Sequence, residues 1–123
     1  MSYIDGFVIP CPKDRKQAFI DHATRTDAMF LELGALRIVE CWADDVPNGT
    51  LTDFRMAVKT EEHEEVAFSW IEWPDKATRD AAFAKLMDPE NTDSRVSMAS
   101  NPPPFDGKRM IFGGFVPLVD LKK

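Results

Sequence analysis

Four short runs rich in aromatic and β-branched residues, separated by two stretches of helical periodicity, divide this chain of 123 residues. Runs of this kind predict β-strands, and helical stretches with one apolar stripe predict helices that pack on a sheet. The predicted strands are 3–9, 36–43, 66–73 and 108–116, and the predicted helices are 13–33 and 76–87. Their order, β-α-β-β-α-β, is typical of a ferredoxin-like α+β fold, in which two helices cover one face of a four-stranded antiparallel sheet.

Each predicted helix has an expected buried face. In the first helix this face is an apolar stripe made of Phe19, Ala23, Phe30 and Leu33. Gly34 follows the stripe at the position where a left-handed conformation commonly ends a helix. The second helix begins after an expected N-cap at Asp75, and its spacing predicts an inward face made of Ala77, Ala81, Ala84 and Leu86. Outside these elements, 53–59 is expected to form a helical turn and 92–99 a short helix.

A formal charge of −6, from 15 Lys and Arg against 21 Asp and Glu, disfavours binding to nucleic acid. The chain also lacks an apolar run of the ~20 residues that a membrane-spanning helix needs, and its first residues do not read as a signal peptide. We therefore expect one cytoplasmic domain, 1–123, that binds neither nucleic acid nor a membrane. The two cysteines and two histidines show no metal-ligand spacing, so neither a metal nor another cofactor is expected.

The predicted strands are apolar on both faces, and two helices can cover only one. In 66–73, for example, Phe68 and Trp70 alternate with Ile71 and Trp73. Each large apolar side chain left in water forgoes roughly 1.5–3 kcal/mol. We therefore predict a homodimer in which two sheets pack face to face as a dimeric α/β barrel. The alternative is that the long loop and the proline-rich segment of the same chain cover the second face.

The predicted strands also place carboxylates beside aromatic rings, on the face expected to point away from the helices. If that face lines a semi-enclosed cavity, desolvation raises the pKa values of these carboxylates, which suits general acids and bases. We therefore predict Asp5, Glu40 and Glu72 as catalytic residues for proton transfer, and Trp42, Trp70 and Phe112 as apolar walls of a ligand site.

The same residues have a structural interpretation. A strand-end carboxylate commonly pairs with an arginine, here Arg37 or Arg109, or meets solvent. Gly113 and Gly114, inside the last predicted strand, also allow two interpretations: a β-bulge, or a place where a ligand approaches the backbone. The sequence leaves these alternatives open.

Four segments resemble the YbaA-like bacterial family of unknown function: YIDGFVIP at 3–10, GALRIVECWADDVPNGTLTDF at 34–54, FSWIEWPDKATRD at 68–80 and PFDGKRMIFGGF at 104–115. The resemblance runs nearly the whole chain and departs from the family only in 88–101. It implies a ferredoxin-like fold in the dimeric α+β barrel superfamily, found as a soluble homodimer. It implies no activity and no catalytic residues, so the candidate residues above rest on the strand pattern alone.

Two functions fit these observations. In the first, the protein binds a small, partly apolar molecule and catalyses proton transfer or oxygenation on it without a cofactor. In the second, it is a non-catalytic binding or assembly module whose aromatic sheet face is used up by dimerisation. The sequence does not decide whether the protein is an enzyme. A cavity with convergent polar groups would favour the first function, and an interior filled by side chains would favour the second.

Overall fold

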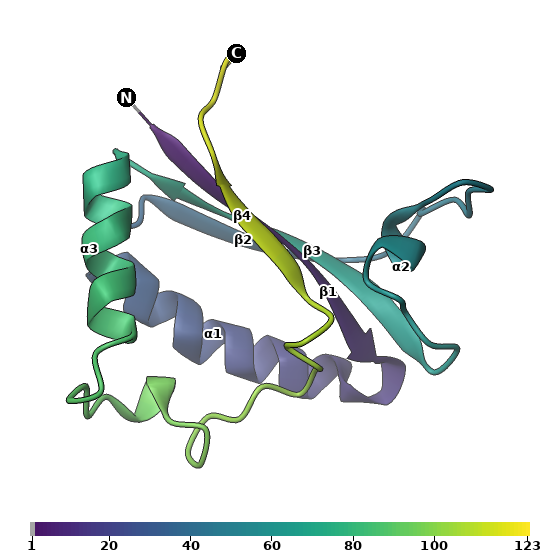
Figure 1. Ribbon diagram of the computed structural model, residues 1–123, viewed down its shortest axis with the longest axis horizontal. Coiled ribbons are helices and arrows are strands. Elements are labelled where there is room, and N and C mark those ends of the chain that lie inside the picture. Colours follow the sequence, from purple (N-terminus) through teal and green to yellow (C-terminus); the bar gives the residue numbers. More distant parts are fainter. Residues whose placement is uncertain (1) are drawn as a thin grey trace.

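The computed structural model of this chain describes residues 2–123. Its strands are β1 (Tyr3–Pro12), β2 (Arg37–Trp42), β3 (Glu64–Trp73) and β4 (Ile111–Phe115). They form one antiparallel sheet in the order β2-β3-β1-β4 (Figure 1). Helices α1 (Lys16–Glu32) and α3 (Lys76–Leu86) both lie on one side of this sheet (Figure 1). The predicted α+β ferredoxin-like arrangement is therefore confirmed.

Three short helical segments complete the fold. The 3-10 turn η1 (Lys13–Arg15) leads into α1, and α2 (Phe54–Ala57) is the helical turn predicted within 53–59. The helix predicted at 92–99 is reduced to the 3-10 turn η2 (Ser94–Val96). The predicted N-cap of α3 is confirmed, because the Asp75 carboxylate accepts a hydrogen bond of 2.7 Å from the backbone N–H of Thr78.

Of the four strands, β1 and β4 depart most from their predicted bounds. β1 continues beyond its predicted end at 9 through Pro10 to Pro12, although proline commonly stops a strand. Only Ile4 to Val8 pair with β4, so beyond Val8 one side of β1 is an open edge, where proline is tolerated. β4 is shorter than predicted, because the backbone N–H of Arg109 donates to the carbonyl of Asp106 and turns the chain before the strand begins.

The buried face of α1 is the predicted stripe, and that of α3 is not. Phe19, Ala23 and Phe30 are buried, and Gly34 ends the helix with φ of +113°. In α3 the predicted face is wrong at three of its four positions, because Ala77, Ala81 and Ala84 are exposed. The helix instead turns Ala82, Phe83 and Leu86 toward the core. Arg79 lies on the same side of α3 and hydrogen-bonds to Asp5 of the sheet. This contact is consistent with α3 being rotated about its axis relative to the predicted orientation.

The register of the sheet assigns each side chain to a face. Tyr3, Asp5, Phe7, Ile9 and Cys11 of β1 stand opposite odd-numbered residues of β3, on the face that the helices cover. The other face carries further large apolar side chains, which are Ile4, Val8, Val39, Phe68, Trp70, Ile111 and Phe115. Both faces are therefore apolar, as the alternation in the sequence indicates.

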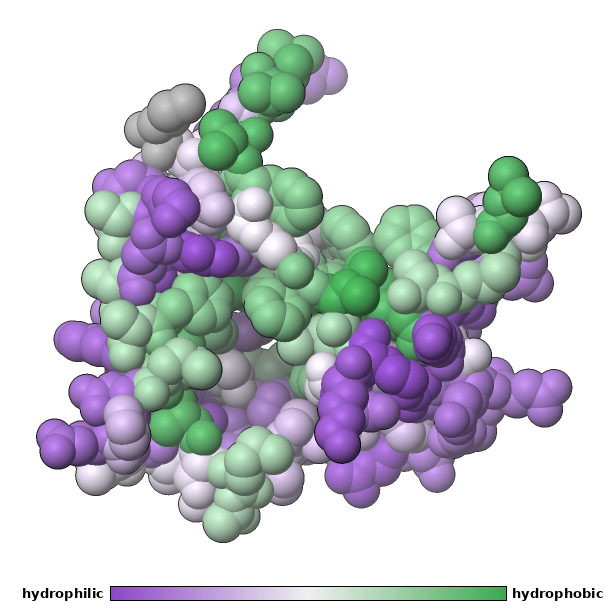
Figure 2. Space-filling view, in the orientation of Figure 1, coloured by the Kyte–Doolittle hydropathy of each residue, from purple (hydrophilic) through white to green (hydrophobic). Residues whose placement is uncertain are grey.

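The chain covers only part of the face opposite the helices. Phe54 of α2 packs edge-on against Phe68 at 6.0 Å between ring centroids, yet Phe68, Ile111 and Phe115 remain 43–61% exposed. The proline-rich segment lies on the helix side instead, where Phe105 contacts Phe19. Figure 2 shows apolar side chains along the hollow between the C-terminal tail and the loop that carries α2. Coverage by this segment and loop within one chain is therefore incomplete.

Among residues 2–123, neither α1 nor any other helix combines the length and the apolar character required to cross a bilayer.

Candidate functional site

The strand pattern predicts that the candidate residues lie on one face of the sheet, but in the structure the six residues are divided between the two faces. Asp5, Glu40 and Trp42 lie on the face that the helices cover, because Asp5 stands opposite Ile71 and Glu40 opposite Ser69. Trp70 and Glu72 lie on the other face, and Phe112 is at the β4 edge of the helix face, directly opposite Phe7. The assignment of Asp5 and Glu40 to the uncovered face is therefore wrong. Alternation separates the two faces of a strand but does not say which one the helices cover.

Asp5 is enclosed by hydrogen bonds and does not line the cavity or the groove described below. It is 2% exposed, and its carboxylate accepts hydrogen bonds from Trp73 Nε1 at 2.8 Å and from Arg79 Nη2 at 2.9 Å. The Arg79 guanidinium in turn lies over the rings of Tyr3 and Phe83. This arrangement corresponds to the structural interpretation of a strand carboxylate, with Arg79 in place of the arginines considered from the sequence.

Glu72 and Trp70 contact each other on the uncovered face. Trp70 Nε1 donates to Glu72 Oε2 at 2.9 Å, and Arg37 Nη1 lies 3.9 Å from the same oxygen. The expected pairing with Arg37 is thus present. Arg109 pairs with a different carboxylate, that of the buried Glu64, through two hydrogen bonds of 2.6 and 2.7 Å.

A cavity of about 130 Å³ lies between α1, the helix face of the sheet and the segment that precedes β4. Small side chains at Ala23 on α1 and Ser69 on β3 leave this space unfilled. Its walls are mainly apolar, formed by Phe7, Ile9, Phe19, Phe30, Ile71, Phe83, Phe105 and Met110. The polar side chains that reach it are His22, Thr26, Asp27, Glu40 and Ser69. Glu40 is therefore the only sequence-predicted candidate that lines this cavity within residues 2–123.

Asp27 of α1 and Glu40 of β2 form a carboxyl pair at one side of the cavity. Burial raises the pKa of Glu40 to about 8, and the neighbouring charge of Asp27 adds to this effect. Burial likewise raises the pKa of Asp27 to about 6. Two carboxyl groups so placed share a proton near neutral pH, since ionising both would bring like charges together.

The same two carboxyls also line a second space of about 290 Å³ on the outer side of α1 and β2, together with Trp42 and Lys16. Glu40 stands on an edge strand and is exposed as a residue, and it lines both the inner cavity and this outer space. The pair thus lies between the apolar cavity beneath α1 and a groove on the outer side of the helix. A proton on Glu40 can exchange with solvent through that groove.

Ser69 contributes a buried hydroxyl beside the Glu40 carboxyl. The residue is 1% exposed, its Oγ has no hydrogen bond of good geometry among residues 2–123, and its weaker interaction with Glu40 opposes the rise in the pKa of that carboxyl. A buried hydroxyl without a partner costs roughly 1–3 kcal/mol. Because this hydroxyl stands beside Glu40 in the register and lines the cavity, a bound molecule with a polar atom could satisfy it.

His22 and Asp27 were not among the candidate residues predicted from the sequence. His22 packs edge-on against Phe105 at 5.8 Å, and its Nδ1 lies 3.0 Å from Asn101 Oδ1. Burial lowers the pKa of His22, which keeps the imidazole neutral. Only Asp27 left a signal in the sequence: it lies four residues after Ala23 and three before Phe30, at the margin of the buried stripe.

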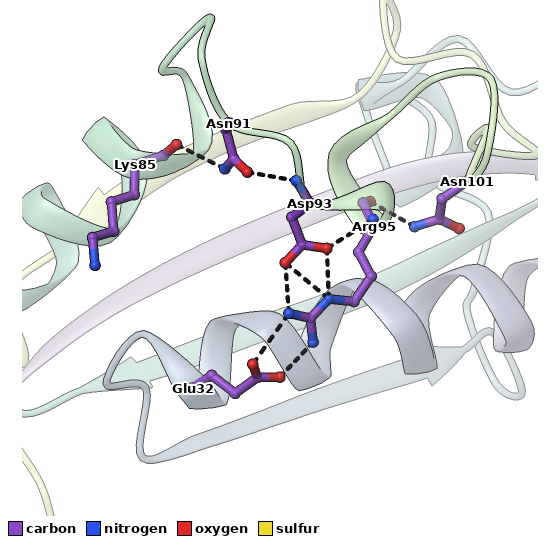
Figure 3. Close-up of polar contacts among 6 residues, drawn as sticks. All are labelled: Glu32, Lys85, Asn91, Asp93, Arg95 and Asn101. Atoms are coloured by element: carbon purple, nitrogen blue, oxygen red, sulfur yellow. Dashed lines mark hydrogen bonds and ion pairs between the residues drawn. The ribbon is translucent and has the colours of Figure 1, made fainter.

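The segment between α3 and β4, residues 87–110, covers the cavity and is bound to α1; we call it the covering segment. In Figure 3 the Arg95 guanidinium lies between Asp93 of its own segment and Glu32 of α1, and hydrogen-bonds to both. Asn101, which is 3% exposed, donates to Thr26 Oγ1 at 3.0 Å. Among residues 2–123, no cluster of three or more His, Cys, Asp or Glu side chains could hold a metal ion.

Known proteins similar in sequence match nearly the whole chain. The family model described as "Protein of unknown function (DUF1428)" matches residues 2–107. The chain is 56% identical over 120 residues to the uncharacterized protein YbaA of Escherichia coli strain K12, with 98% of this chain and 99% of that protein covered. YbaA of Shigella flexneri matches with the same identity and coverage.

Two solved structures share the fold. A dimeric ferredoxin-like protein from an uncultured marine organism superposes with a TM-score of 0.60 at 11% identity, covering 98% of this chain and 100% of that one. A mutant of SnoaB, a cofactor-independent oxygenase from Streptomyces nogalater, superposes with a TM-score of 0.55 at 16% identity, covering 98% of each chain. At these identities the likeness concerns the fold alone.

Proposed function

This chain belongs to the DUF1428 family of proteins of unknown function, and we propose that it binds a small, largely apolar molecule in the cavity beneath α1 and transfers a proton to or from it. The observation that carries this proposal is the Asp27–Glu40 carboxyl pair, which faces apolar walls with pKa values raised toward neutrality. A group that titrates near the working pH is suited to both donating and accepting a proton.

The size of the cavity indicates the size of the ligand. A dry apolar cavity of roughly 150 Å³ accommodates benzene, so a space of about 130 Å³ suits a single ring or a short branched chain. One polar atom on the ligand would meet the free hydroxyl of Ser69 and the carboxyl of Glu40. A carbonyl compound with acidic protons on the adjacent carbon fits these requirements. Larger ligands would extend past the carboxyl pair into the outer groove.

The proposal includes a homodimer formed through the uncovered sheet face. Ile111 and Phe115 are exposed there, and the C-terminal tail adds Leu118, Val119 and Leu121, each at least 77% exposed. So many exposed apolar side chains are rare on a monomer. The hollow between the tail and the α2 loop is wide and apolar, which suits a second copy of the sheet (Figure 2). The dimeric ferredoxin-like protein of similar fold also supports this assembly.

Two further functions are kept as alternatives. Cofactor-independent oxygenation of the same ligand is supported by the fold shared with SnoaB, which is an oxygenase. A non-catalytic assembly module is supported by the apolar sheet face itself, which dimerisation alone would explain. Oxygen uptake in the presence of a ligand would support the first alternative. A stable dimer whose cavity takes up no small molecule would support the second.

Hydrogen–deuterium exchange of cyclohexanone tests the proposed function. The ring is close to benzene in size, and the carbons beside its carbonyl exchange protons through an enol. We expect the protein to accelerate this exchange, measured by proton NMR in D2O, and Asp27→Asn and Glu40→Gln to lose the acceleration. Asp21→Asn is the matched control, because Asp21 is exposed on the outer side of α1. No acceleration over buffer, with no binding of cyclohexanone or phenol by ligand-observed NMR, would contradict the proposal.

A further inference from the structure

We propose that His22 is the general base of this cavity, and that Asn101 holds it as the tautomer whose Nε2 carries the free lone pair. For its chemistry this inference rests on the proposed function, since it names the residue that accepts the proton. The tautomer follows from hydrogen bonding alone and is measured without any ligand.

The orientation of the Asn101 side chain is fixed by its neighbours. One end of the amide lies 2.8 Å from the backbone oxygen of Arg95 and 3.0 Å from Thr26 Oγ1 (Figure 3 shows the contact with Arg95). A backbone carbonyl can only accept, so this end must be the nitrogen, Nδ2. The other end, which faces His22, is therefore the oxygen, Oδ1.

The tautomer of His22 follows directly. Asn101 Oδ1 has no proton to give, so His22 Nδ1, 3.0 Å away, must carry the hydrogen. In a neutral imidazole the other nitrogen, Nε2, is then an unprotonated acceptor. Nε2 has no hydrogen-bond partner among residues 2–123. It is also not among the side-chain atoms that are both without a partner and fully buried, so part of its surface is accessible. A ligand or a water molecule can therefore reach it.

The surroundings of His22 keep this lone pair available. Burial is the main reason that the pKa of His22 is lowered, and the charge of Arg25 on the same helix acts in the same direction. From the covering segment the ring is packed by Phe105 and bonded by Asn101. The carboxyls that line the same cavity are Asp27 of α1 and Glu40 of β2. Arg95 of the covering segment is already paired with Asp93 and Glu32.

The base and the acid stand apart within one cavity. His22 and Asp27 are five residues apart on α1, which is ~7.5 Å along the helix axis. In the proposed step, His22 Nε2 takes a proton from the carbon beside the ligand's carbonyl, and the electron pair of the broken C–H bond forms the enol double bond. The carbonyl oxygen takes the proton held by the Asp27–Glu40 pair. An imidazolium and a carboxyl pair with both groups ionised result, and because the two like charges repel each other, the pair readily takes a proton back in the reverse transfer, which restores both groups.

Asn101 links this chemistry to the covering segment. The amide that fixes the tautomer also joins the segment to Thr26 of α1. If the segment leaves α1, His22 loses the acceptor that holds the proton on Nδ1. The base is therefore fully formed only when the cavity is covered, and Asn101 is a positioning residue.

The tautomer is tested by nitrogen-15 NMR of the ¹⁵N-histidine-labelled full chain. We expect Nδ1 of His22 to show its attached proton and Nε2 to resonate as an unprotonated nitrogen at pH 7.5. In Asn101→Ala the two tautomers should mix, whereas His63→Gln, at an exposed histidine, should leave the His22 signals unchanged and assign them. A protonated Nε2 in the wild-type protein would overturn the inference.

The role as base is tested by the cyclohexanone exchange. General bases typically contribute 10²–10⁴-fold, so we expect His22→Gln to slow the exchange at least about 100-fold. His63→Gln should have no effect. Asn101→Ala should slow the exchange less and shift its pH profile, which loss of packing alone would not do. If His22→Gln exchanges like the wild type while Glu40→Gln does not, the base assignment falls and the proposed function stands. If the wild type neither accelerates the exchange nor binds cyclohexanone or phenol, the base assignment and the proposed function both fall.

Discussion

Arg79 reaches from α3 to both carboxylate oxygens of Asp5 on β1, with hydrogen bonds of 2.9–3.2 Å that join the helix layer to the centre of the sheet. The carboxylate side chain is 3% exposed and the arginine 22%, so this ion pair is largely removed from water. Trp73 donates a third hydrogen bond to the same carboxylate. Asp5 is therefore bound on all sides by structural partners and has no free oxygen for a ligand.

Replacing Asp5 should destabilise the fold strongly. Asp5→Ala leaves the Trp73 N–H without a partner in the interior and leaves Arg79 with only its exposed partner Asp80; breaking such a buried pair typically costs about 3–5 kcal/mol. Asp80→Ala is the matched control, since Asp80 is an exposed partner of the same arginine and should cost less than about 1 kcal/mol. Urea unfolding measures both changes, and equal losses for the two variants would contradict a structural role for the Asp5 pair.

The carboxyl pair should make stability fall with rising pH. A folded state that raises a carboxyl pKa binds protons more tightly than the unfolded chain, so stability is lost as pH rises through the folded-state values, about 6 for Asp27 and about 8 for Glu40. The lowered pKa of His22 acts in the opposite direction below about pH 6.5. Burial raises the pKa of Cys11 to about 11, outside this range.

The range from pH 6.5 to pH 8.5 therefore isolates the effect of Glu40 in urea unfolding. The wild-type midpoint should fall across this range, while the midpoint of Glu40→Gln, which cannot ionise, should stay nearly level. Parallel curves for the two proteins would show that the carboxyl of Glu40 is not held protonated.

Gly114 should tolerate no side chain. A Cβ there would lie 2.3 Å from the Tyr3 hydroxyl and 2.6 Å from its ring, and Tyr3 is held by the Arg79 cation. We expect Gly114→Ala to cost about 1–3 kcal/mol through overpacking. At Gly107 a Cβ would meet nothing within 4 Å, so Gly107→Ala should be nearly neutral. Thermal unfolding of both variants checks this expectation, and a neutral Gly114→Ala would contradict the close approach of Tyr3.

A charge on the uncovered sheet face should break the proposed dimer. Phe115→Lys would bury an unpaired ammonium between two apolar sheets, so we expect a monomer at micromolar concentration by light scattering coupled to gel filtration. Leu31→Lys is the matched control, because Leu31 is a similarly exposed apolar side chain on α1. The dimer proposal is abandoned if the wild-type chain itself is monomeric.

The alternation of apolar residues was sufficient to predict the sheet, its helices and its two apolar faces. It could not show which face the helices cover, because both sets of side chains are apolar. Asp5 and Glu40 were therefore placed on the wrong face. The register settles this point, since it puts Phe7 and Glu40 opposite Ser69 from either side.

The structure also explains why β4 contains Gly113 and Gly114, for which the sequence allowed two interpretations. β4 pairs with β1 without a bulge, with Gly113 opposite Gly6 and Gly114 opposite Asp5. Gly114 makes room for the Tyr3 ring, and the Phe115 ring lies 3.5 Å or more from the Cβ position at Gly113. Contacts between residues so distant in sequence leave no trace in local composition.

The site depended on contacts that periodicity does not encode. Asp27 meets Glu40 only because α1 packs against the edge strand β2, and His22 meets Asn101 across 79 residues of chain. The inward face of α3 was wrong for a related reason. Alanine spacing indicated one side of the helix, whereas the contacts of Arg79 and Phe83 with the sheet belong to another.

Glu40 stands where the inner cavity and the outer groove meet, on a strand with one free edge. If Glu40 is the proposed acid, it can regain a proton from bulk water on one side while its other side faces a bound molecule. Repeated proton transfers would then not require the segment before β4 to move away, because ligands and protons would enter by different routes.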